Sequence, residues 1–85
     1  MNDRLPAICD ELLGVLRTRL RSGESIDAET DLLEGDLLDS LEVMALVAEV
    51  EKRYGVRLEN ADIAPRNFRT AAALARLVAE RSAPG

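Results

Sequence analysis

Apolar residues recur every three or four positions along most of this chain, and almost none of them is aromatic. Such spacing is typical of amphipathic α-helices, because it places the apolar side chains on one face of each turn. Leu, Val, Ile and Ala carry the pattern, whereas aromatic residues make up only 2% of the chain. A β-sheet would draw more heavily on aromatic and β-branched residues. The sequence therefore predicts an all-α fold.

Residues that begin or end helices predict the bounds of the first two. The first helix is expected over roughly 3–21, with Pro6 tolerated in its first turn and Cys9 on its apolar face. The second is expected over about 39–54. Gly55 would close it, because glycine readily adopts the left-handed conformation found after a helix end.

The rest of the chain divides in the same way. Residues 22–39 form a long connection whose Ile and Leu side chains are expected to hold it across the bundle. A short helix is predicted near 64–68, with Pro65 in its first turn. Thr70 is a suitable N-cap for a last helix over 71–81.

The length of 85 residues predicts one domain with one modest core. We expect a monomeric bundle of three longer helices and one short helix over 1–81, followed by a disordered tail at 82–85. The chain has no run of about 18 apolar residues and no charged-then-apolar leader, so neither membrane insertion nor secretion is expected. The single cysteine cannot form an internal disulfide, which favours a cytoplasmic location.

The composition disfavours an enzyme. The chain has no histidine and one cysteine, so it lacks the usual general base, the usual thiolate nucleophile and the ligands of most zinc sites. Asp27, Glu29 and Asp31 have part of the spacing of a calcium loop. The glycine and the terminal glutamate of that loop are missing, so no metal site is predicted.

Acidic residues are concentrated in one part of the chain. Residues 22–51 contain ten Asp and Glu but no Lys or Arg, within a chain of net charge −5. This segment disfavours binding to the phosphate backbone of nucleic acids. Two interpretations remain open for it: it serves solubility alone, or it steers basic partner proteins toward the surface.

Ser40 stands at the predicted start of the second helix. Asp39 and Glu42 are three positions apart there, which is the spacing of a capping box with Asp39 as the N-cap. Ser40 would then be the first helical residue, with its hydroxyl free and close to N–H groups that favour a phosphate. Alternatively, Ser40 is itself the N-cap and carries nothing.

The second helix divides into three strips along its length. Its core face is predicted to comprise Val43, Leu46, Val47, Val50 and Tyr54. Glu42, Glu49 and Arg53 lie on the opposite side, with Lys52 at its edge. The third strip, beside Ser40, comprises Leu41, Met44 and Ala48. This strip either widens the buried face or forms an exposed apolar patch on which a partner docks.

The segment Gly35-Asp36-Leu37-Leu38-Asp39-Ser40-Leu41, followed by this helix and Tyr54-Gly55-Val56, resembles the acyl and peptidyl carrier protein family. The resemblance extends from the first helix to the run Ile63…Pro65…Phe68…Thr70. It implies that a phosphopantetheinyl transferase uses coenzyme A and Mg²⁺ to attach 4′-phosphopantetheine to Ser40, which Asp39 helps to present. An acyl- or aminoacyl-activating enzyme would load cargo on the arm as a thioester, and downstream transferases would receive it.

Within that family, "LLDS" is more similar to the D-alanyl carrier and to stand-alone aminoacyl or peptidyl carriers than to fatty-acid carriers. Fatty-acid carriers often have acids where this chain has Ala45, Lys52 and Arg53. The resemblance implies that partner enzymes contact the following residues: Leu41, Glu42, Met44, Ala48 and Glu49. Two alternatives stay open: an unmodified helical adaptor that only binds proteins, and a kinase target at Ser40.

Overall fold

The computed structural model describes residues 4–20, 26–34 and 38–82, and in these residues it contains helices and no strands. The elements are α1 (Arg4–Arg19), α2 (Ser40–Tyr54), the 3₁₀ helix η1 (Asn60–Asp62), α3 (Pro65–Phe68) and α4 (Ala71–Ser82). The predicted bundle of three longer helices and one short helix is confirmed, and η1 is an element that the sequence analysis did not predict. No helix within the described ranges is long and apolar enough to cross a bilayer.

The first two helices follow their predicted signals closely. Helix α1 ends at Arg19, slightly earlier than expected, and the predicted limits at 3 and 21 lie outside the described residues. Helix α2 ends at Tyr54, as predicted. Gly55 has a φ of 66° and donates its N–H to Glu51 O at 2.9 Å, so it closes the helix in the left-handed conformation.

Helices α3 and α4 also begin where expected. Pro65 occupies the first position of α3, where its missing N–H leaves no hydrogen bond unmade. Thr70 caps α4, because its Oγ1 accepts the N–H of Ala73 at 3.0 Å. Helix α4 continues to Ser82, one residue beyond the predicted end, and 83–85 lie outside the described residues.

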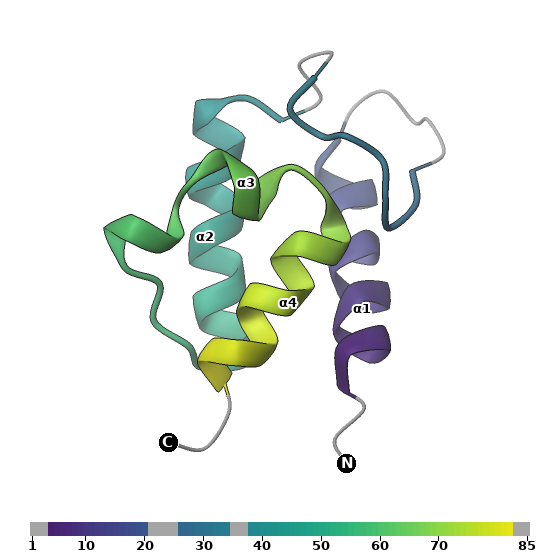
Figure 1. The fold of residues 1–85 in the computed structure, drawn as a ribbon. Coiled ribbons are helices and arrows are strands. Elements are labelled where there is room, and N and C mark those ends of the chain that lie inside the picture. Colours follow the sequence, from purple (N-terminus) through teal and green to yellow (C-terminus); the bar gives the residue numbers. More distant parts are fainter. Residues whose placement is uncertain (1–3, 21–25, 35–37, 83–85) are drawn as a thin grey trace.

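Aliphatic side chains from all four α-helices form one core. Figure 1 shows α4 crossing between α1 and α2, and α4 packs most extensively on α1. Leu12, Leu16 and Leu74 are fully buried in this core. Each such leucine contributes about 1.5–3 kcal/mol relative to an exposed position. Cys9 packs against the core, as predicted, and burial together with the charges of Asp10 and Glu29 raises the pKa of its thiol.

The connection between α1 and α2 is tied to the bundle at several points. Leu32 donates its N–H to Arg69 O at 2.7 Å, and Ala72 donates to Ala28 O at 3.0 Å. The side chains of Ile26, Leu32 and Leu38 are buried, as the sequence analysis predicted, whereas Leu37 lies outside the described residues. The connection therefore delivers the chain to the start of α2 from a position anchored against α4.

Candidate functional site

Asp39 is the N-cap of α2. Its backbone is extended, and its Oδ1 accepts the N–H of Glu42 at 2.8 Å. The carbonyl of Asp39 accepts the N–H of Val43 at 2.9 Å, which is the first hydrogen bond of the helix. The structure thus selects Asp39 over Ser40 as the cap. The carboxylate of Glu42 turns toward Arg19 rather than back to the cap, so only one half of the predicted capping box is formed in the described residues.

Ser40 is the first residue of α2, and its side chain is exposed. Within the described ranges its hydroxyl makes no hydrogen bond, since capping is done by the preceding aspartate. It lies at a helix N-terminus, where unpaired N–H groups and the helix dipole favour negative charge. The position therefore fits a phosphate-linked group attached through Oγ, because the oxygen is accessible and takes no part in the N-cap of α2.

An apolar groove of about 530 Å³ begins beside Ser40. Its walls come from the connection before α2, from α2 itself and from the segment around α3, with Asp39 and Ser40 at the rim. The apolar side chains that line it include Leu33, Leu38, Val43, Met44, Ile63 and Phe68. An extended group on Ser40 could lie against these walls. Sequence reasoning did not predict the groove, because its two walls come from segments that are distant in the sequence and lie side by side only in the folded chain.

The three strips of α2 are distinct in the structure. Leu46, Val47 and Val50 are buried, and Val43 and Tyr54 pack against the core at its edge, so the predicted core face is confirmed. The third strip points to solvent: Leu41 is 80% exposed and Met44 is 54% exposed, and Ala48 is exposed as well. These residues therefore form an exposed apolar patch rather than an extension of the buried face.

A model of the family described as phosphopantetheine attachment site matches residues 7–78, which include Asp39 and Ser40. The chain belongs to this family of acyl and peptidyl carrier proteins. Its members hold 4′-phosphopantetheine covalently, so this chain is a carrier that bears that group. No curated protein and no solved structure gives a significant match.

Two of the carboxylates on α2 of this carrier, those of Glu42 and Glu49, face α1. Arg19 Nη1 lies 3.5 Å from Glu42 Oε1, and Arg19 Nη2 lies 3.9 Å from Glu49 Oε1. Arg53 adds a contact of 3.9 Å to the second oxygen of Glu49. Glu42 and Glu49 were predicted to contact partners together with Leu41, yet the structure places them on the flank beside α1. Sequence reasoning missed Arg19, whose only local signal was a base in the last turn of a helix.

The far end of α2 is fixed by two side-chain hydrogen bonds. Tyr54 Oη donates to Glu11 Oε1 at 2.6 Å, which joins α2 to α1. Burial and the carboxylate of Glu11 raise the pKa of Tyr54, so this phenol stays protonated. Glu51 Oε2 accepts the N–H of Leu58 at 2.9 Å and holds the chain that follows α2. Together these contacts orient the helix that presents Ser40 at its other end.

Asp62 supports the opposite wall of the groove. It is only 5% exposed, and its Oδ2 accepts the Nε–H of Arg81 and the N–H of Glu59, both at 3.0 Å. The side chain of Asn67 donates to the carbonyl of Asp62 at 2.8 Å, which ties α3 to η1. The guanidinium of Arg81 and the Glu59 N–H lower the pKa of Asp62 to about 2. This cluster was not predicted; the only hint was an acid three positions after Glu59.

Proposed function

We propose that this carrier bears its 4′-phosphopantetheine on Ser40. The observation that carries the proposal is the N-cap at Asp39, which leaves the Ser40 hydroxyl exposed at the start of α2. In the attachment reaction the Ser40 oxygen forms a bond to phosphorus, and the pyrophosphate bond of coenzyme A breaks. Adenosine 3′,5′-bisphosphate leaves, and the serine proton passes to a base of the transferase.

The residues around Ser40 would hold and orient the group. The N–H groups at the first turn of α2 favour its phosphate, and the apolar groove beside Ser40 offers walls for the chain that follows. Asp39 keeps Ser40 at the first helical position, and we propose it as a contact for the transferase. When bound, the group supplies a terminal thiol on which cargo is carried as a thioester.

We further propose an aminoacyl or similar short acyl cargo, loaded by an activating enzyme and passed to downstream transferases. The support for this is the similarity of "LLDS" to aminoacyl and D-alanyl carriers. Partner enzymes would dock on the exposed residues Leu41, Met44 and Ala48. Glu42 and Glu49 flank this patch, and because both are close to Arg19 they would steer basic partners less strongly than unpaired acids would.

The test is the intact mass of the chain after incubation with coenzyme A, Mg²⁺ and a broad-specificity phosphopantetheinyl transferase. We expect the native chain to gain one phosphopantetheine and Ser40→Ala to gain none. Ser82→Ala is the matched control, because it removes another helical serine hydroxyl, one that donates to Ala79 O at 3.3 Å.

The assignment of Ser40 would be supported if Ser82→Ala gained the same mass as the native chain and Ser40→Ala gained none. A gain on Ser40→Ala would move the attachment site to another residue. If several transferases modified none of the proteins, the unmodified adaptor would become the better explanation of the exposed patch.

A further inference from the structure

The exposed face of α2 carries a positive charge, that of Lys52, near the C-terminal end of the helix. Leu41, Met44, Ala48 and Lys52 follow one another at helical spacing, and all four are exposed; we call this row the outer strip. Lys52 lies eight positions after Met44, which corresponds to about 12 Å along the helix. The outer strip is therefore apolar near Ser40 and positively charged at its far end.

The acids of α2 do not lie on the outer strip. Glu42 and Glu49 contact Arg19 on the α1 side of the helix. Glu51 is turned the other way and accepts the N–H of Leu58. A partner that approaches the outer strip thus meets Leu41, Met44 and Lys52 first, although the surrounding segment is acidic in sequence.

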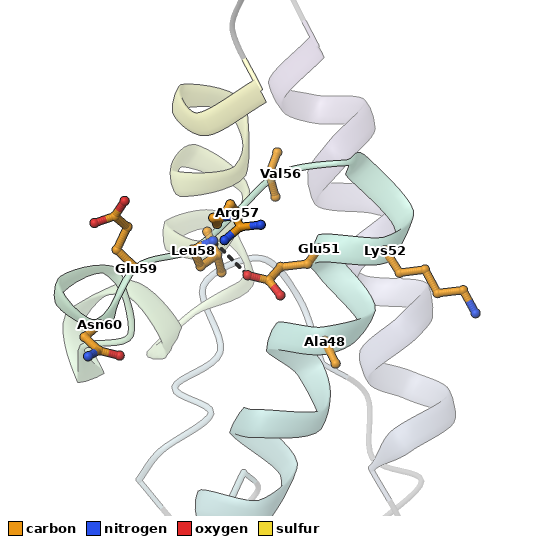
Figure 2. Close-up of a pocket in the computed structure, with 8 residues that line it drawn as sticks. All are labelled: Ala48, Glu51, Lys52, Val56, Arg57, Leu58, Glu59 and Asn60. Atoms are coloured by element: carbon orange, nitrogen blue, oxygen red, sulfur yellow. Dashed lines mark hydrogen bonds between the residues drawn. The ribbon is translucent and has the colours of Figure 1, made fainter.

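A groove of about 800 Å³ continues from the outer strip toward the chain that follows α2. Ala48, Glu51 and Lys52 of α2 line one side, and the other side includes Arg57, Glu59 and Asn60. Figure 2 shows Lys52 extending away from the edge formed by Glu59 and Asn60. Lys52 and Arg57 form no ion pair with any other described residue.

We propose that the surface that docks on this carrier presents apolar side chains to Leu41 and Met44 and a carboxylate to Lys52. The argument is charge complementarity: an exposed cation about 12 Å along the helix from Met44, the nearer residue of the exposed apolar pair, matches an Asp or Glu placed at that distance from the partner's own apolar residues. Arg57, which lines the groove beside the outer strip, is exposed and adds a second positive charge.

This proposal rests on the proposed function, since the docking surface belongs to enzymes that serve the carrier. The proposal adds the sign and the position of the charge on the partner enzyme that aligns this enzyme with the carrier. The net charge of the carrier alone predicts a basic partner. The outer strip instead predicts that the partner has an acidic residue opposite Lys52. Such a contact orients the partner along α2 and so sets which of its surfaces reaches Ser40.

The test uses three helical peptides with the same apolar face. They differ at one position, about 12 Å from the apolar residues, which is Glu, Gln or Lys. Each is titrated into ¹⁵N-labelled Ser40→Ala chain at low salt, and amide shifts are followed by NMR. Because this variant carries no group on residue 40, the result does not depend on whether the proposed attachment is right.

We expect the Glu peptide to bind roughly two- to five-fold more tightly than the Gln peptide, the range for an exposed ion pair. Shifts should follow the outer strip, and the Lys peptide should bind least. Lys52→Glu in the same background should reverse this order, whereas Lys52→Gln should abolish the difference between peptides. High salt should bring the three affinities together.

Three results would overturn the proposal. One is equal binding of the peptides at low salt, and another is preference for the Lys peptide with shifts at Glu42 and Glu49. The third is no binding by any peptide, which would show that the outer strip is not a docking face. None of these three results would affect the test of attachment at Ser40, which depends on the mass measurement alone.

Discussion

Two aspartates of this carrier accept a backbone N–H three residues away, yet their surroundings differ. Asp39 caps α2 through Glu42 N at 2.8 Å, and its side chain is exposed. Asp62 accepts Glu59 N at 3.0 Å, but it is almost fully buried and is also held by Arg81. Asp39 is an N-cap that accepts the N–H of the third helical residue, on an open surface. Asp62 is a third helical residue that accepts the N–H of the N-cap, inside a network between segments.

The difference shows how one residue type serves two purposes. Asp62 joins η1 to the end of α4 and, through its carbonyl, to Asn67 in α3, so it holds the groove wall opposite α2. Asp39 orders one helix end and leaves Ser40 accessible. Substitutions at Asp62 should therefore change stability most, and substitutions near Asp39 should change modification more than stability.

The largest stability effect is expected at Asp62. Asp62→Asn removes the charge that faces Arg81 and should lower Tm at pH 7 more than the other substitutions considered below. The pKa of Asp62 is about 2 in the folded chain, against about 4 in an unfolded one. Its contribution is thus fully present above about pH 4 and is lost as the pH falls toward 2.

The measurement is thermal unfolding by circular dichroism between pH 7 and pH 2 for the native chain and Asp62→Asn. Their Tm values should converge as the pH falls from 4 to 2. Asp10→Asn is the control, because Asp10 is exposed on α1, and its Tm should follow that of the native chain. A Tm difference that stays constant over this pH range would contradict the assigned role of the Asp62 charge.

A smaller loss is expected at Asp39. Asp39→Ala removes the N-cap, which costs about 1 kcal/mol and lowers Tm by roughly 4–8 °C in a domain of this size. Asp39→Ser should restore most of the stability, since serine also caps helices. We expect both variants to be modified more slowly than the native chain, as followed by initial rates of mass gain.

Comparing these two variants separates the cap from the carboxylate. Slow modification of a stable Asp39→Ser protein would mean that the transferase contacts the carboxylate itself. If all three proteins were modified at the same rate, Asp39 would have no part in the transferase contact and would serve the helix alone.

The smallest stability effect is expected at Ser40. Ser40→Ala removes an exposed hydroxyl that has no partner among the described residues, so the free energy of unfolding should change by no more than about 0.5 kcal/mol. Denaturant unfolding of the unmodified proteins measures it. A loss as large as that of Asp39→Ala would show that the hydroxyl supports the helix start, and the contrast with Asp39 would disappear.

The helices were predictable because their signals are local. Asp39 before Ser40, Gly55 after Tyr54 and Pro65 at the start of α3 each act through a backbone contact within about four residues. The periodicity of α2 likewise separated its core face from the strip that contains Leu41. The 3₁₀ helix η1 was missed because its only local sign was the pair Glu59 and Asp62, which has no strong N-cap residue in front.

The site was predictable only in part. The motif predicted Asp39 and Ser40 as site residues, and this assignment stays a prediction. The sequence left two interpretations of Leu41 and Met44 open, and the exposure of their side chains in the structure decided between them. The charge of α2 was misleading, because the acidic run in the sequence does not show that Glu42 and Glu49 contact Arg19. That contact depends on how closely α1 and α2 approach each other.

The sequence by itself determined the all-α class and the ends of α2, and it limited the N-cap of α2 to Asp39 or Ser40, because each of these follows from interactions between near neighbours in the chain. Tertiary structure alone decided which side of α2 carries the accessible charge, where the apolar groove opens and how Asp62 is buried. These features need residues 19 to 23 positions apart, as in Asp62–Arg81 and Arg19–Glu42, to meet in space. The local periodicity of the sequence does not predict these contacts, since they form only when the whole core packs.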